Sequence, residues 1–294
     1  MLGHLTILEV VDLLLMLGGG GILVGKLVRH QRRLGRDPLQ GSPLRVNTLS
    51  AYWVWLALLA YVLSGLIGFG IAMFYNPGGP AADVELWRTI IGGNIAQLIV
   101  AGAVLAIAAH TFVAGLRGLG VGRQPFGRDL WAAVQGLLVG FCLCNLVLWA
   151  TDAGLRLFAP RFEMPMHGVF ITLAMPTTPL FVRFNAILGA ALLAPIGEEL
   201  LFRGILQTAC QRLVPPRWHS LYHRWIAIVG VATLFGLMHL ATPQQVPALI
   251  VLGILLGILY ERTGSILAPI YLHVLFNSKS LTWHYLESVV NTVP

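Results

Sequence analysis

Residues 195–204 read Pro-Ile-Gly-Glu-Glu-Leu-Leu-Phe-Arg-Gly, and this segment places two adjacent carboxylates and a guanidinium in an otherwise apolar stretch. It follows the apolar residues 186–194 without a polar break. An ionised side chain at the centre of a bilayer costs at least about 2.5–3.5 kcal/mol on insertion scales, so such groups normally face the interior of a helix bundle and carry function. The segment therefore predicts a membrane helix with a functional centre.

Helical spacing separates the roles of these three charged residues. Glu199 and Arg203 stand at positions i and i+4, so their side chains share one helix face and can form an ion pair. Glu198 lies about 100° away around the helix and has no such local partner. We expect Glu198 to find its partners on other helices.

The composition of the chain indicates a polytopic membrane protein. Of its 294 residues, 57% are hydrophobic and only 11% are charged, which is too apolar for a soluble domain. No polar interval is long enough to build a soluble core. The net charge of +7 comes from basic residues in short loops, a pattern of membrane topology, so we expect no nucleic-acid partner.

We predict an all-α bundle of about eight transmembrane helices that forms one membrane domain. Residues 1–183 form an N-terminal region of four spans and an outside loop, and residues 184–294 form a core of four further spans. The basic loops after the first, third and fifth spans are expected in the cytoplasm, which places the N-terminus outside. The predicted spans are residues 5–28, 51–74, 89–116, 130–150, 184–213, 225–240, 246–260 and 265–281.

Other polar residues occur within these predicted spans. Glu9 and Asp12 lie near the start of the first span, and we interpret them as an outer pair that faces water. The third span carries Asn94 and Gln97, to which we assign no role.

Two of the last spans supply polar groups that complement Glu198. The sixth span ends with His239, and the eighth carries His273 and Asn277 at positions i and i+4. A single membrane histidine, such as His239 alone, is more often an interhelical hydrogen-bonding group. Together, a carboxylate, two imidazoles and an amide are suited to activating water and stabilising an oxyanion.

The motifs in this region resemble those of the CAAX protease and bacteriocin-processing family of intramembrane proteases. The resemblance covers residues 184–280, and the first half of the chain shows no such likeness. The motif residues are Glu198-Glu199-x-x-x-Arg203, Phe235-x-x-x-His239 and His273-x-x-x-Asn277.

This resemblance implies a glutamate-dependent endopeptidase with eight helices. Glu198 would be the base that activates water, with assistance from His239. His273 and Asn277 would donate to the oxyanion, while Glu199, Arg203 and Phe235 would support the site. In eukaryotes the family trims prenylated C-termini.

Two versions of the chemistry remain open at this point, one without a metal and one with zinc. A zinc site would use Glu198, His239 and His273 as ligands. It would leave Glu199 as the base, although that residue is expected to pair with Arg203, and the chain contains no His-Glu-x-x-His motif. We prefer the version without a cofactor.

Other classes of function also fit the polar residues. An ion- or proton-coupled transporter would need the ionisable groups strung across the membrane, whereas a protease needs them at one point. A non-catalytic scaffold of the same fold is a third alternative. The expected partners are the lipid bilayer and a peptide or protein substrate in or at the membrane.

The composition also bears on where the protein resides. Its basic residues are seventeen arginines and two lysines, and Ala, Gly and Leu are abundant, which is typical of a bacterial protein. We therefore expect an integral multi-pass protein of the bacterial inner membrane, where prenylated substrates are not expected.

Overall fold

The chain folds into a bundle of helices. The structure is a computed structural model that describes residues 7–32, 39, 41–42, 49–122, 124–213 and 222–290, and these contain no β-strand. The predicted all-α membrane fold is confirmed. The elements are α1 (Ile7–Arg32), α2 (Ala51–Ala72), α3 (Ala81–Thr111), η1 (Gly115–Leu119), α4 (Phe126–Phe158), α5 (Gly168–Ala174), α6 (Leu180–Leu188), η2 (Gly189–Leu193), α7 (Ala194–Glu199), η3 (Leu200–Gln207), α8 (Thr208–Leu213), α9 (Tyr222–Leu237), η5 (Pro243–Gln245), α10 (Val246–Thr263) and α11 (Leu267–Val290).

Among the described residues, six helical segments are long and apolar enough to cross a membrane, so the predicted count of eight is not confirmed. The apolar part of α9 is shorter, and the more polar α11 is not among the six. The six segments are Ile7–Lys26, Ala51–Ala72, Ala81–Thr111, Phe126–Phe158, Leu180–Arg212 and Pro243–Thr263.

Several helix boundaries differ from the prediction: α3 begins at Ala81 and α11 continues to Val290. Helix α4 extends to Phe158, well past its apolar stretch, and its exposed end carries an ion pair between Arg156 and Asp152 at 2.7 Å. Helix α9 ends at Leu237, so His239 lies in the following turn and not inside a helix as expected. The nearby Pro243 disfavours a helical conformation at the residue before it, which is consistent with the break.

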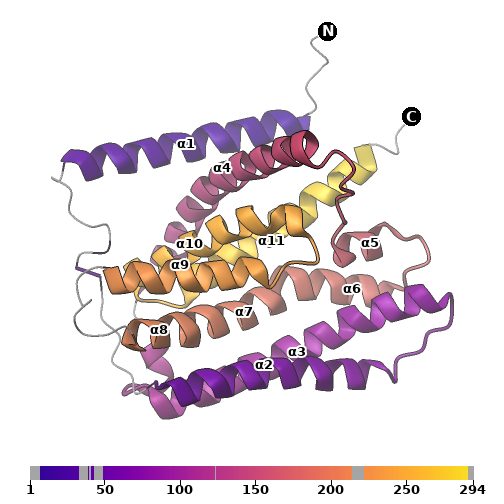
Figure 1. Cartoon of the computed structure of the whole chain (residues 1–294), viewed down its shortest axis with the longest axis horizontal. Coiled ribbons are helices and arrows are strands. Elements are labelled where there is room, and N and C mark those ends of the chain that lie inside the picture. The colour runs from indigo at the N-terminus through magenta and orange to yellow at the C-terminus, as the bar shows by residue number, and fades with distance from the viewer. Residues whose placement is uncertain are drawn as a thin grey trace, which may run out of the picture.

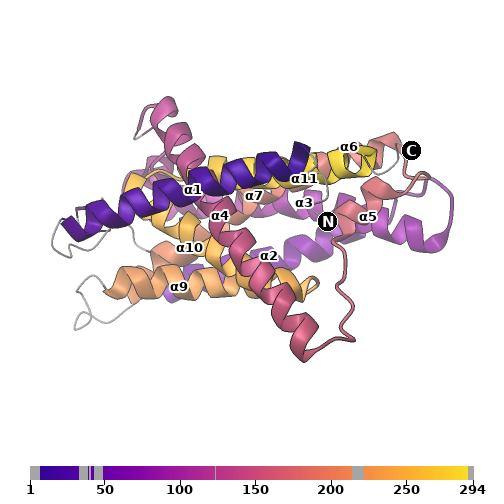
Figure 2. The ribbon, with the colours of Figure 1, turned by 90° about the horizontal axis from the view of Figure 1, so that it is seen from above.

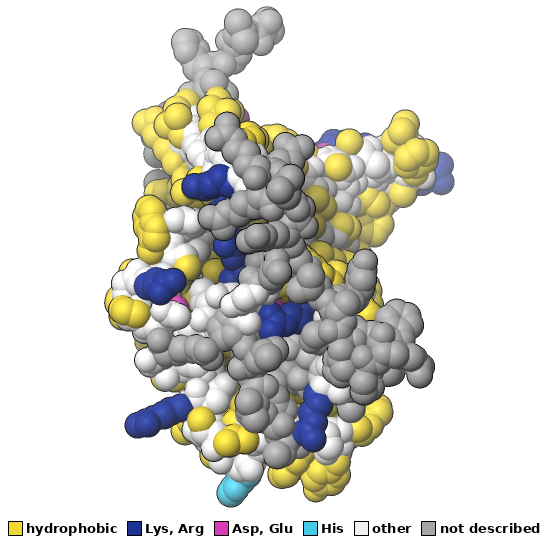
Figure 3. Space-filling view, turned by 90° about the vertical axis from the view of Figure 1, so that its left-hand side faces the viewer, with side chains coloured by type: hydrophobic (Ala, Val, Ile, Leu, Met, Phe, Trp, Pro, Cys, Tyr) yellow, Lys and Arg dark blue, Asp and Glu magenta, His cyan; other side chains and the backbone are white. Residues whose placement is uncertain are grey.

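The helices run roughly side by side (Figure 1). Helices α2 and α3 pair along one side of the bundle, α1 lies against α4 on another, and α1 begins on the side where α11 ends (Figures 1 and 2). Figure 3 views the opposite end, where several Lys and Arg side chains gather. Much of the predicted cytoplasmic loops, namely residues 33–38, 43–48 and 214–221, lies outside the described residues.

Helices α6, α7 and α8 form one continuous span interrupted by two π-helical turns, η2 and η3. These turns flank the pair Glu198 and Glu199 on either side. Pro195 lies in the first turn of α7, directly after η2, and proline cannot donate the hydrogen bond of a regular helix. Wider turns of this kind often occur at functional sites, because they change the direction of the side chains that follow.

Asp12 does not face water with Glu9 as predicted, because it pairs with a lysine of the last helix. Its Oδ1 lies 3.0 Å from Nζ of Lys279, and the two side chains are 34% and 17% exposed. The ammonium also lies over the rings of Phe141 and Trp283, 4.1 and 4.2 Å from their centroids. A lysine in an apolar helix needs such partners, so this pair links α1 to α11.

Candidate functional site

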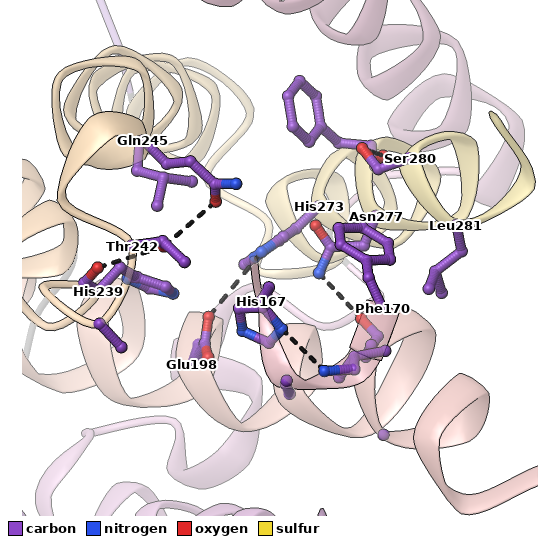
Figure 4. A pocket seen from close by; sticks show the side chains of 18 of the residues that line it. His167, Phe170, Glu198, His239, Thr242, Gln245, His273, Asn277, Ser280 and Leu281 are labelled. Carbon is purple, nitrogen blue, oxygen red and sulfur yellow. Dashed lines mark hydrogen bonds and ion pairs between the residues drawn. The ribbon is translucent and has the colours of Figure 1, made fainter. Parts of the chain in front are cut away.

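A cavity of about 660 Å³ lies within the bundle and takes its walls from both halves of the chain. Helices α3 and α4 and the segment around α5 form one part, and α7, α10 and α11 form the other. The four residues predicted to be catalytic all line this cavity (Figure 4): Glu198, His239, His273 and Asn277.

The predicted ion pair between Glu199 and Arg203 is present and fully buried. Arg203 donates from a guanidinium nitrogen to Oε1 of Glu199 at 3.0 Å, and the side chains are 1% and 0% exposed. A second guanidinium nitrogen donates to the backbone carbonyl of Gly253 on α10, also at 3.0 Å. The pair therefore connects the central helix to α10.

Glu199 also holds one of the two site histidines. Its Oε1 accepts a hydrogen bond from Nδ1 of His273 at 2.9 Å. The other ring nitrogen, Nε2, lies 3.9 Å from Oε2 of Glu198, whose side chain is 16% exposed. This separation is too long for a direct hydrogen bond and short enough for one water molecule to contact both atoms.

The second histidine, His239, is oriented by the helix that precedes it. Its Nδ1 lies 2.8 Å from the carbonyl oxygen of Phe235, which can only accept, so Nδ1 donates; in the neutral ring Nε2 would then carry the lone pair. The fully buried ring of Phe235 packs against both histidines, at 5.0 Å from His239 and 5.7 Å from His273 between centroids. Phe235 thus sets the positions of both imidazoles.

Asn277 contacts the central helix one turn of α11 beyond His273. Its Nδ2 donates to the carbonyl oxygen of Ala190 at 2.9 Å. Ala190 belongs to the π-helical turn η2, whose backbone therefore has a side-chain partner. The expected donation of Asn277 to an oxyanion stays a prediction.

The cavity also contains groups to which the sequence analysis gave no role. His167 lines it from the segment before α5, and burial lowers the pKa of this imidazole, as does the nearby His239. Gln245, at the start of α10, and Gln97, on α3, line it as well. The positions of these three residues in the sequence do not indicate that they lie near the catalytic motifs, because they approach the motifs only when the helices pack.

The geometry of a metal site is not evident in the described part of the chain. No three His, Cys, Asp or Glu side chains there are grouped so that they could hold an ion. Both site histidines use Nδ1 for partners within the protein, namely Phe235 and Glu199. Independence from metal remains a prediction.

The fold and the cavity define a multi-pass membrane protein with a carboxylate and two imidazoles at an internal site. Residues 180–278 match the family model described as type II CAAX prenyl endopeptidase Rce1-like, which supports the resemblance to the CAAX protease family. The match runs from the start of α6 into α11 and includes all of the motif residues. Comparisons with curated proteins and with solved structures gave no significant match.

Proposed function

We propose that the protein is an intramembrane endopeptidase in which Glu198 activates a water molecule for attack on a peptide bond. The observation that carries the proposal is the position of Glu198 Oε2, 3.9 Å from Nε2 of His273 at the wall of a large cavity. The proposed base and the proposed oxyanion donor are therefore close enough for one water molecule to contact both.

In the proposed reaction, the water oxygen attacks the carbonyl carbon while Glu198 accepts a water proton. The free lone pair on Nε2 of His239 can help to orient the water. The oxyanion that forms on the carbonyl oxygen receives hydrogen bonds from Nε2–H of His273, in its doubly protonated form, and from the second N–H of Asn277. Glu198 then returns the proton to the amine nitrogen as the C–N bond breaks.

The arrangement of the ionisable groups favours a peptidase over a transporter. Glu198, His239 and His273 all border one cavity, whereas a proton relay needs its groups spread along a path through the membrane. A non-catalytic scaffold would need no such convergence. Transport or scaffolding would be supported if substitution of Glu198 left every cellular peptide unchanged.

We propose chemistry without a metal, with zinc at Glu198, His239 and His273 as the alternative. Oε1 of Glu199 accepts from both His273 and Arg203, and the side chain is fully buried and does not line the cavity, so Glu199 is poorly suited to replace Glu198 as the base. Purified protein treated with 1,10-phenanthroline and then freed of the chelator should keep its rate. A loss that added zinc restores would establish the alternative.

The proposed substrates are peptides or membrane-anchored proteins cut at the bilayer, and the proposed location is the bacterial inner membrane. The test is quantitative proteomics of membrane peptides from cells that produce the wild type or Glu198→Gln. Purified protein is then assayed on internally quenched CAAX peptides with and without an S-farnesyl cysteine. Fragments that depend on Glu198 support the proposal, and identical peptide profiles in both experiments contradict it.

Asn277→Ala should lower the rate of cleavage by about tenfold to a hundredfold and leave measurable activity, because His273 still donates to the oxyanion. The kcat of purified variants on a cleaved peptide measures this. Ser280→Ala is the matched control, since Ser280 also lines the cavity from α11 but donates to its own helix at Phe276. A loss as complete as that of Glu198→Gln would contradict the assigned roles.

A further inference from the structure

We propose that the side-chain amides of Gln97 and Gln245 bind backbone carbonyl groups of the peptide substrate. This inference rests on the proposed peptidase function and adds the means by which the cavity holds an extended chain. The two residues come from α3 and from the start of α10, on separate walls of the cavity.

The five side-chain amides that line the cavity fall into two groups. Three of them each donate one N–H to a carbonyl oxygen of the chain itself, and this bond holds the amide in place. These are Asn94 to Asn185 at 2.7 Å, Asn145 to Phe141 at 2.8 Å and Asn277 to Ala190 at 2.9 Å. The two glutamines make no such donation within the part of the chain that the structure describes.

The amide of Gln245 is oriented by the turn in which it lies. Its Oε1 accepts a hydrogen bond from the hydroxyl of Thr242 at 3.4 Å, and Thr242 is 2% exposed. Because the oxygen faces Thr242, the NH₂ group points the other way, on the side of the cavity where His273 lies (Figure 4). The same threonine hydroxyl lies 3.4 Å from the carbonyl oxygen of His239. Thr242 therefore connects Gln245 to the turn that contains His239.

The amide of Gln97 lies close to the central helix. Its Oε1 is buried without a hydrogen-bond partner and lies against Gly197, where an added Cβ would be only 2.2 Å from that oxygen. Only glycine, which has no Cβ, allows this approach. Gly197 immediately precedes Glu198, so Gln97 lies next to the proposed base. With its oxygen buried there, Gln97 presents the NH₂ group as the polar end that the cavity can reach.

A peptide backbone in this cavity needs such donors. A carbonyl group that leaves water without a new hydrogen bond is strongly penalised, and much of the lining is aliphatic or aromatic. Two neutral donors can bind backbone carbonyls without introducing a charge and without contacting the side chains of the substrate. The cavity is therefore expected to accept peptides of varied sequence.

The test measures binding to inactive protein, so that it does not depend on turnover. A fluorescein-labelled CAAX peptide, with and without the farnesyl group, is titrated onto Glu198→Gln protein in detergent micelles and followed by fluorescence anisotropy. Adding Gln97→Met or Gln245→Met should raise Kd by about tenfold each, the effect of leaving one buried carbonyl unpaired. Methionine has a similar length but offers no donor.

A thioamide scan of the same peptide distinguishes a direct contact from a structural effect. Sulfur accepts hydrogen bonds weakly, so replacing a contacted carbonyl should weaken binding to the parent protein. The carbonyl bound by Gln245 should show no such effect in Gln245→Met, and the carbonyl bound by Gln97 should show none in Gln97→Met. The controls are Leu98→Met, an exposed neighbour on α3, and Gln244→Met, whose amide donates to Pro165 outside this cavity. Both should leave Kd within about twofold.

The possible outcomes separate this inference from the proposed function. Unchanged Kd in both glutamine variants, equal losses in the controls, or no binding of either peptide would overturn the inference. Binding that depends on both glutamines, in a protein whose wild type cleaves neither peptide, would retain the inference and refute the peptidase. Cleavage that depends on Glu198 but not on the glutamines would support the peptidase and refute the inference.

Discussion

Glu198→Gln is expected to abolish peptide cleavage while the protein still folds. Glutamine has the shape of glutamate but cannot accept the proton of the attacking water, and a general base contributes about a hundredfold to ten-thousandfold in rate. The side chain lies at the cavity wall and forms no short ion pair, so its charge is not needed for packing. The kcat on a cleaved peptide and the thermal midpoint in detergent test both halves of the expectation.

The residues of the site are expected to act as one unit. Adding His239→Ala to Glu198→Gln should therefore lower the rate little further, because groups that serve the same step are not additive. Glu85→Gln is a suitable control, since it makes the same change at an exposed position outside the cavity. Near-native cleavage by Glu198→Gln would rule out the proposed base.

Loss of the buried ion pair is expected to have the largest effect on stability. Arg203→Ala leaves the carboxylate of Glu199 buried beside His273 without its guanidinium partner, and such an uncompensated charge typically costs about 3–5 kcal/mol. The substitution also removes the hydrogen bond to Gly253 and the contact of the guanidinium with the ring of Phe235. A reduced folded yield and a lower thermal midpoint in detergent should result.

The chain contains a matched control for this prediction. Arg156 and Asp152 form an ion pair with the same spacing in α4, but their side chains are 74% and 39% exposed. Arg156→Ala should leave the thermal midpoint almost unchanged, because exposed pairs are screened by solvent. Equal midpoints for Arg203→Ala and the wild type would show that the buried pair does not support the site.

Glu199→Gln tests the link between this pair and catalysis. It keeps a side chain that can accept the bond from His273 but removes the charge that compensates Arg203. Both stability and kcat should fall, since the orientation of His273 depends on the same oxygen that binds Arg203. Normal stability with normal activity would separate Glu199 from the site altogether.

Some features of the molecule followed from local sequence alone. The membrane class follows from long apolar segments, because an uncharged helix of sufficient length is favoured in lipid whatever surrounds it. The pair of Glu199 and Arg203 follows from the period of the helix, which brings positions i and i+4 together. Each motif lies within one short segment and can be recognised from spacing, and five motif residues line the cavity: Glu198, Phe235, His239, His273 and Asn277.

Other features depended on how distant segments pack, and no local pattern contains that information. The pairing of Asp12 with Lys279 joins the first helix to the last, and His273 reaches Glu199 only because α11 lies against α7. Gln97 and Gln245 became recognisable as possible donors only in the tertiary structure, where each of the other three amides of the cavity donates to a backbone carbonyl. Helix periodicity and hydropathy act over a few residues, whereas a hydrogen bond between helices requires a tertiary arrangement that only the whole bundle determines.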